Sequence, residues 1–202
     1  MKILYATQNA AKVHNMRRRL AGTGIEIVTP ADLGVHVEIE EDGRTVAENA
    51  TKKAESYAPL VDMPVLAADS GLLIEGLPDD QQPGTHVRRV NGRLLTDDEM
   101  IDYYAALAGR LGGERRAHYV TGLAMIAGGR RFCESIPENE FLLVSTPNPN
   151  RHHTGNPLDV VALDPRDRRY HNDLSDADFE DAAWTFERAC LRFVTEALGE
   201  GE

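Results

Sequence analysis

The sequence predicts an α/β protein with a mixed, twisted sheet flanked by helices, arranged as two lobes around a central cleft. Helix and strand patterns alternate early in the chain and strand patterns cluster later, an order that favours a mixed sheet over a purely parallel one. The chain has 202 residues, 42% of them hydrophobic, and is long enough to bury one substantial core. We therefore expect a single domain over residues 1–202.

Short apolar runs bounded by turn residues predict the strands. They are expected over residues 2–6, 25–28, 64–68, 72–74, 117–127, 131–136, 140–145 and 158–163. The strand over residues 64–68 is expected to end at Asp69-Ser70-Gly71, with residues 72–74 as its neighbour.

Apolar residues at helical spacing, together with caps and breakers, predict the helices. They are expected over residues 9–21, 45–58, 97–111 and 177–198. Their expected caps are Asn9, Thr45 in a capping box with Glu48, Thr96 or Asp97, and Ser175 or Asp176. The polar run over residues 146–156 predicts a loop.

Composition excludes several classes of protein. No apolar stretch approaches the roughly 20 residues that span a bilayer, and the first apolar run is too short for a signal peptide, so a cytoplasmic protein without a membrane partner is expected. The formal net charge of −11 argues against a nucleic-acid polymer as partner, although a nucleotide could bind through Mg²⁺ and a few cations. Cys133 and Cys190 lack metal-ligand spacing, and both are expected to be buried free thiols.

The N-terminal strand leads into its helix through Thr7-Gln8-Asn9, with Lys12 in the first helical turn. The first amides of such a helix are expected to stay unpaired, and with the helix dipole and Lys12 they would suit a phosphate group. The alternative is that Asn9 only caps the helix and Lys12 is a solvated charge.

Three motifs then follow one another within about the first 90 residues. They are Ala6-Thr7-Gln8-Asn9-Ala10-Ala11-Lys12, Glu41-Asp42-Gly43-Arg44-Thr45-Val46-Ala47-Glu48-Asn49-Ala50-Thr51-Lys52-Lys53-Ala54, and Ala68-Asp69-Ser70-Gly71-Leu72. In this order they resemble the patterns A-T-x-N-x-x-K, E-x-G-x-T-x-x-E-N-A-x-x-K-A and D-D-S-G-L of the inosine triphosphate pyrophosphatase family. Members of that family hydrolyse noncanonical purine nucleoside triphosphates to monophosphate and pyrophosphate.

The resemblance implies roles for individual residues. Asp69 is the implied catalytic residue, as general base or as a metal ligand, and Glu40 or Glu41 is implied to hold Mg²⁺ beside it. The implied substrate-binding residues are Thr7, Asn9, Lys12, Lys53, Ser70, Arg89 and Asp159. Arg89 is included because Pro83-Gly84 and Arg89 resemble the family's P-G-x-x-x-A-R. The family also suggests a homodimer.

The second half of the chain departs from the family's base-reading patterns. The G-x-G-F-G-Y-D-P loop appears only as Gly155-Asn156-Pro157-Leu158-Asp159-Val160, which keeps Asp159 but has Leu158 at the aromatic position. In K-x-x-x-S-H-R-x-x-A the three basic positions fall on Glu180, Thr185 and Phe186, and the first Asp of D-D-S-G is Ala68. Trp184, Phe186 and Phe193 could stack a base, or they could be core residues at helical spacing.

The expected function is Mg²⁺-dependent hydrolysis of nucleoside triphosphates to monophosphate and pyrophosphate, with an altered base pocket. Carboxylates with Mg²⁺ would activate water, and Lys and Arg would neutralise the leaving pyrophosphate. Two alternatives stay open: a catalytically weak nucleotide-binding relative, or a phosphohydrolase for a specialised phosphorylated metabolite. Singly, Glu48 could be only a cap, Asp69-Ser70-Gly71 a tight turn, and Lys52 and Lys53 a solvated helix face.

Overall fold

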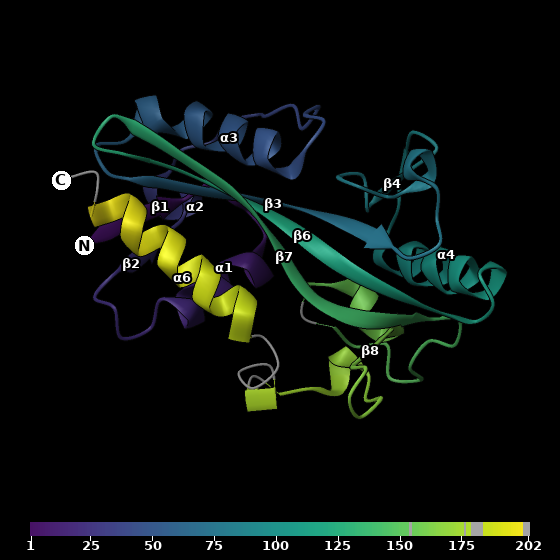
Figure 1. Ribbon diagram of the computed structural model, residues 1–202. Helices are drawn as coiled ribbons and strands as arrows, with labels where there is room; N and C mark the ends of the chain where they lie inside the picture. Colours follow the sequence, from purple (N-terminus) through teal and green to yellow (C-terminus); the bar gives the residue numbers. More distant parts are fainter. Residues whose placement is uncertain (154, 176, 179–183, 200–202) are drawn as a thin grey trace. The chain divides into compact units, whose positions relative to one another are not determined.

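The computed structural model describes residues 1–153, 155–175, 177–178 and 184–199. The predicted α/β fold, with a mixed sheet flanked by helices, is confirmed (Figure 1). The chain divides into two compact units. Unit 1 comprises Met1–Ser70, Val120–Pro137 and Thr185–Glu202, and unit 2 comprises Gly71–Tyr119 and Glu138–Trp184. The cleft between two lobes stays a prediction.

The main sheet has the strand order β2-β1-β3-β6-β7-β8. Its strands are β1 (Lys2–Tyr5), β2 (Glu26–Val28), β3 (Val65–Ile74), β6 (Glu114–Ala127), β7 (Arg130–Val144) and β8 (Ala162–Leu163). Strand β1 pairs in parallel with β2 and β3, with Leu4 opposite Val65, whereas β7 and β8 are antiparallel. A separate antiparallel pair is formed by β4 (Arg89–Val90) and β5 (Arg93–Leu94).

The helices of the described part are α1 (Ala10–Arg19), α2 (Pro30–Leu33), α3 (Val46–Tyr57), α4 (Asp97–Arg110) and α6 (Trp184–Gly199), with 3-10 helices η1 (Ala58–Leu60), η2 (Asp79–Gln81), η3 (Pro157–Val161) and η4 (His171–Asp173). Of these, α1, α3 and α4 begin directly after a predicted cap, whereas α2 was not predicted. Asn9, Thr45 and Thr96 are the N-caps of α1, α3 and α4. The capping box expected at Thr45 is only half formed, because the Glu48 carboxylate accepts from the N–H of Arg44 rather than from that of Thr45.

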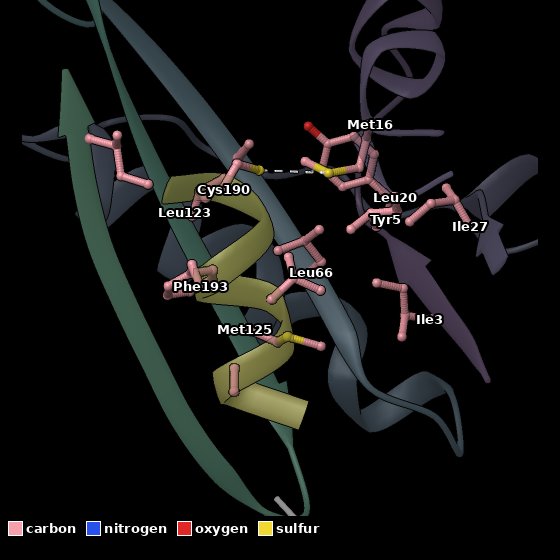
Figure 2. Packing of buried hydrophobic residues seen from close by; sticks show 14 of the residues in the cluster. Ile3, Tyr5, Met16, Leu20, Ile27, Leu66, Leu123, Met125, Cys190 and Phe193 are labelled. Carbon is pink, nitrogen blue, oxygen red and sulfur yellow. Dashed lines mark hydrogen bonds between the residues drawn. The ribbon is translucent and has the colours of Figure 1, made fainter. Parts of the chain in front are cut away.

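In unit 1 the sheet is covered on both faces. Leu66 and Ala68 of β3 lie in a hydrophobic cluster with residues of α1 and α6, of which Figure 2 shows Met16, Cys190 and Phe193. The alternating residues Val65 and Ala67 lie in a second cluster with the buried face of α3. Because side chains alternate along a strand, Asp69 lies on the α3 face and Ser70 on the other.

Unit 2 has a core of its own. The buried face of α4 packs with η3 and with β3, β6 and β7 residues. The members from α4 and η3 are Met100, Ile101, Tyr104, Ala105, Leu107, Ala108, Leu158, Val160 and Val161. The helical spacing seen in the sequence over residues 97–111 is therefore the spacing of a buried face.

Three predicted strand boundaries are wrong. Strand β3 runs without a break through Asp69-Ser70-Gly71, because these residues pair within the sheet instead of turning. Strand β7 continues through Pro137, where β8 does not reach it, and proline is tolerated where one side of a strand is unpaired. Residues 157–161 form η3, which leaves only Ala162–Leu163 as strand.

The C-terminal helix and the cysteines also differ in part from expectation. Residues 177–178 are helical and α6 covers Trp184–Gly199, whereas residues 179–183 of the predicted helix, with Glu180, lie outside the described part. Cys190 is buried as predicted, but Cys133 is exposed, although its thiol lies 3.5 Å from Oγ1 of Thr51 in α3, and composition cannot tell how fully a strand position is covered. Within the described ranges no helix is long and apolar enough to cross a membrane.

Candidate active site

The acidic loop over residues 37–43 and the following Arg44 fold back on α3 through four successive contacts. Glu41 and Asp42 form ion pairs with Lys53 and Lys52, respectively. The next two residues donate backbone N–H groups to α3 side chains, Gly43 to Asn49 and Arg44 to Glu48. The register of the loop on the helix is therefore set residue by residue, and the helical spacing of positions 49 and 53 puts both side chains on one face.

Lys53 lies between two carboxylates that come from different segments. Its Nζ is 3.0 Å from Oδ1 of Asp69 on β3 and 2.9 Å from Oε1 of Glu41 in the loop. The side chains of Lys53 and Asp69 are 12% and 7% exposed, so this pair is nearly removed from water. The alternative of a solvated lysine face is wrong for Lys53, although it holds for Lys52, which is 43% exposed and pairs with exposed Asp42.

The second oxygen of Asp69 has a different partner. Its Oδ2 accepts a hydrogen bond of 3.0 Å from Nδ2 of Asn49, which is 1% exposed. Sequence reasoning did not assign a role to Asn49. The signal that could have found it is its position four residues before Lys53, on the face of α3 that meets β3.

A glycine allows α3 to approach the sheet. A Cβ on Gly122 of β6 would lie 2.4 Å from the carbonyl carbon of Val46 and 2.6 Å from the backbone nitrogen of Ala47. Only glycine fits such an approach. The first turn of α3, which precedes Asn49 and Lys53, thus packs directly on the β6 backbone.

A second group of predicted residues lies in the loop between β1 and α1. Oδ1 of Asn9 accepts from the backbone N–H groups of Ala11 at 2.9 Å and Lys12 at 3.2 Å, and Oγ1 of Thr7 accepts from the N–H of Asn9. The expectation that the first helical amides are unpaired is therefore wrong for Ala11 and Lys12. The predicted capping role of Asn9 is confirmed.

The remaining predicted residues have varied surroundings. Ser70 shares a hydrogen bond of 2.8 Å with Oγ1 of Thr121. Glu40 is exposed next to Glu41, and it is Glu41 that reaches Lys53. Arg89 lies exposed in β4 of unit 2.

Asp159, also in unit 2, lies in η3, where its Oδ1 accepts a hydrogen bond of 2.7 Å from Nδ2 of Asn156. Burial raises the pKa of the Asp159 carboxyl to about 7, and the hydrogen bond from Asn156 opposes that rise only in part. The carboxyl of Asp159 can therefore hold a proton near neutral pH.

Two departures from the family pattern fall in one hydrophobic cluster. Ala68 and Phe186 both belong to the cluster of β3, α1 and α6, and both are nearly fully buried. The Arg19 guanidinium lies 4.6 Å from the centre of the Phe186 ring. Phe186 and Phe193 are therefore core residues, and the side chain of Trp184 is outside the described part. Phe186 does not offer an aromatic face for a base.

The carboxylates of the acidic loop and β3 are oxygen ligands of the kind that a hard cation prefers. Glu41 and Asp69 already converge on one positive group, the Lys53 ammonium, from two segments of the chain. In the described part of the chain no group of three or more His, Cys, Asp or Glu side chains could hold a metal. Two carboxylates fit Mg²⁺ in particular, since this ion keeps several waters and takes its other ligands from phosphate.

The mixed sheet flanked by helices is the fold of Ham1 proteins. The chain has the fold of the HAM1 protein from Coxiella burnetii, with a TM-score of 0.78 and 25% identity over 98% of this chain and 100% of that one. A pyrophosphatase structure from Mycobacterium abscessus, titled a nucleoside-triphosphatase and dITP/XTP pyrophosphatase, shares the fold with a TM-score of 0.68 and 24% identity over 95% of this chain and 98% of that one.

Residues 3–140 match the model of the Ham1 family, and the chain belongs to this family. It is 36% identical over 127 residues to a dITP/XTP pyrophosphatase of Thermoanaerobacter pseudethanolicus, covering 62% of this chain and 63% of that protein. A dITP/XTP pyrophosphatase of Methylococcus capsulatus is 38% identical over 119 residues, 58% of each chain. The matches thus span less than two thirds of the length of these relatives.

Proposed function

We propose that this protein hydrolyses nucleoside triphosphates between the α and β phosphates, releasing nucleoside monophosphate and pyrophosphate, with Mg²⁺ as cofactor. The observation that carries the proposal is the nearly buried Lys53, which lies within 3.0 Å of Asp69 and 2.9 Å of Glu41. Membership of the Ham1 family and the names of the relatives support the same reaction.

The proposed role of each residue follows from its charge and its surroundings. Glu41 and Asp69 would hold Mg²⁺, which when bound would supply positive charge to the triphosphate oxygens. The Asp69 carboxylate would take a proton from the attacking water as general base. Lys53, with Thr7 and Asn9 from the β1–α1 loop and Lys12 from the first turn of α1, would orient the triphosphate and neutralise the departing pyrophosphate. Of the two loop glutamates we propose Glu41, since it is the one that reaches Lys53.

The substrate contacts of Ser70, Arg89 and Asp159 belong to the same proposal. We further propose that the protein acts on free nucleotides as a cytoplasmic homodimer, without a nucleic-acid or membrane partner. The net charge of −11 supports the lack of a nucleic-acid partner, because it disfavours binding to long polyanions. Light scattering on the purified protein measures the mass of the assembly directly, and a monomer would contradict the dimer.

The decisive experiment is a pyrophosphate-release screen over inosine, xanthosine, adenosine, guanosine and pyrimidine triphosphates, with Mg²⁺ and with a chelator. We expect pyrophosphate and not orthophosphate as the first product, and only with the metal present. Orthophosphate as the first product would indicate a different hydrolase.

A catalytically weak nucleotide-binding relative is the second candidate. It is favoured by one observation, the replacement of two charged family positions by Ala68 and Phe186 in a hydrophobic cluster. Nucleotide binding by calorimetry without any pyrophosphate release would select it over the enzyme.

A further inference from the structure

Asn49 stands out among the polar side chains of unit 1 because it is 1% exposed and both ends of its amide are used. Oδ1 accepts a hydrogen bond of 2.8 Å from the backbone N–H of Gly43, and Nδ2 donates one of 3.0 Å to Oδ2 of Asp69. The orientation of the amide follows from its partners, since an N–H can only donate and a carboxylate can only accept.

The contact with Asn49 decides how Asp69 presents its two oxygens. With Oδ2 bonded to Asn49, Oδ1 is the oxygen that meets Lys53. A carboxylate with a hydrogen bond at each oxygen from the same helix cannot rotate without breaking one of them. The buried amide of Asn49 thus directs Oδ1 of Asp69 toward the position where the Lys53 ammonium lies and which Glu41 also contacts.

The other end of the amide acts on the acidic loop. Gly43 is two residues after Glu41, the loop carboxylate that shares Lys53 with Asp69. A Cβ on Gly43 would lie 2.5 Å from Oδ1 of Asn49, so the loop reaches the amide only because residue 43 is glycine. One side chain therefore sets the position of both carboxylate-bearing segments.

We propose that Asn49 is a positioning residue that holds Asp69 and, through Gly43, the Glu41 segment in register for one divalent cation. This inference rests on the proposed function, because it assigns the cation that the two carboxylates share. Asn49 itself would touch neither the metal nor the substrate. Partners that orient metal ligands typically change metal affinity or activity about 10- to 100-fold when they are removed.

The test uses two variants that disturb the same amide from opposite sides. Asn49→Ala removes it, and Gly43→Ala displaces it without changing any polar group. Mn²⁺ binding to the whole protein without nucleotide can be measured by water proton relaxation. The Mn²⁺ affinity should weaken by about 10- to 100-fold in both variants. The kcat should fall, and the Mg²⁺ concentration for half-maximal rate should rise by a similar factor, while KM for the nucleotide at saturating Mg²⁺ stays unchanged.

Asn148→Ala is the matched control. Asn148 is 6% exposed, and its Nδ2 donates to a carboxylate in unit 2, Oδ2 of Asp173 at 2.7 Å. Its loss removes the same kind of buried bond and should lower the melting temperature without changing Mn²⁺ affinity. An equal loss of Mn²⁺ affinity in this control would show that general destabilisation is the cause, and would overturn the positioning role.

The outcomes separate this inference from the function on which it rests. Folded variants with the Mn²⁺ affinity, Mg²⁺ dependence and kcat of the wild type overturn the role of Asn49 and leave the proposed function intact. If Asn49→Ala does not fold, the Mn²⁺ affinity and kcat of Gly43→Ala test the role of Asn49. If the active wild type binds no Mn²⁺ without nucleotide, the Mg²⁺ concentration for half-maximal rate in the variants tests it instead. A wild-type protein that neither binds Mn²⁺ nor releases pyrophosphate overturns both.

Discussion

The ammonium nitrogen of Lys53 lies 3.0 Å from Oδ1 of Asp69, and this pair joins helix α3 to the middle of strand β3. Both side chains are nearly buried, so if one of them is removed, water can solvate the charge of the other only in part. The neighbouring Lys52, by contrast, pairs with Asp42 at the surface. Two adjacent lysines of one helix thus form one exposed and one nearly buried ion pair, and replacing each lysine in turn compares the contributions of the two pairs to stability.

Lys53→Ala should destabilise the fold by about 1–3 kcal/mol, because it leaves the buried Asp69 carboxylate without its cation. Lys52→Ala should cost less than about 1 kcal/mol, as is usual for exposed ion pairs. Urea unfolding of both variants at neutral pH measures the difference. Equal losses in the two variants would mean that the burial of Lys53 does not matter for stability.

Asp69→Asn should lower kcat/KM for nucleoside triphosphates by about 10²- to 10⁴-fold, the usual effect of losing a positioned proton acceptor. The amide keeps the size of the side chain, so circular dichroism should show a folded protein. Steady-state pyrophosphate release over a range of nucleotide concentrations gives the value. Full activity of this variant would remove Asp69 from the mechanism.

Gly122→Ala should destabilise the protein by about 1–3 kcal/mol or more, because its Cβ would overlap the backbone of Val46. Gly109→Ala in α4 is the control, since the nearest atom to its Cβ would be 3.7 Å away. In a helix this change is expected to stabilise by up to about 1 kcal/mol. Thermal unfolding of both variants should therefore give shifts of opposite sign.

Asp159→Asn should change the pH dependence of stability. The pKa of Asp159 is about 7 in the folded protein, above its usual value near 4, so the folded state binds this proton more tightly. Protonation of Asp159 therefore stabilises the folded state in full below about pH 4, and this stabilisation is lost as pH rises through about 7, a change on the order of 4 kcal/mol. The asparagine side chain of the variant does not titrate, so the stability of the variant relative to wild type should increase between pH 4.5 and pH 8.

Urea unfolding of both proteins at the two pH values checks this prediction. The comparison with wild type cancels the carboxyls with lowered pKa, such as that of Asp164 beside Arg166, which act in the opposite direction. A stability difference that is the same at both pH values would contradict the prediction.

Base selectivity should be weak. In the resemblance seen in the sequence, Thr185 and Phe186 fall on the family's His and Arg positions, and Phe186 lies in the core, so we expect these positions to lack the cationic donors that would read a 6-keto purine. Discrimination by shape alone reaches only about 10- to 200-fold. A kcat/KM for inosine triphosphate more than about a thousandfold above those for adenosine and guanosine triphosphates would be incompatible with this view.

The sequence alone predicted the features that depend on neighbouring residues. The N-caps at Asn9 and Thr45 and the buried face of α4 were correctly predicted, and Thr96 was one of two candidates for the cap of α4, because capping and helical spacing act over a few residues. The three motifs also identified the family, which the match over residues 3–140 confirms. The roles given to single site residues stay predictions.

Only the tertiary structure decided which groups meet. The bond from Asn49 to Asp69 joins residues 20 positions apart, and it exists because α3 packs on β3 and Gly122 lets it come close. Likewise β3 continues through Asp69-Ser70-Gly71 because these residues belong to the sheet, and the packing around each residue leaves Cys133 exposed and Phe186 buried. Local patterns contain residue type and spacing but no packing partner, so the residue types of the site could be predicted and the contacts of Lys53 and Asn49 could not.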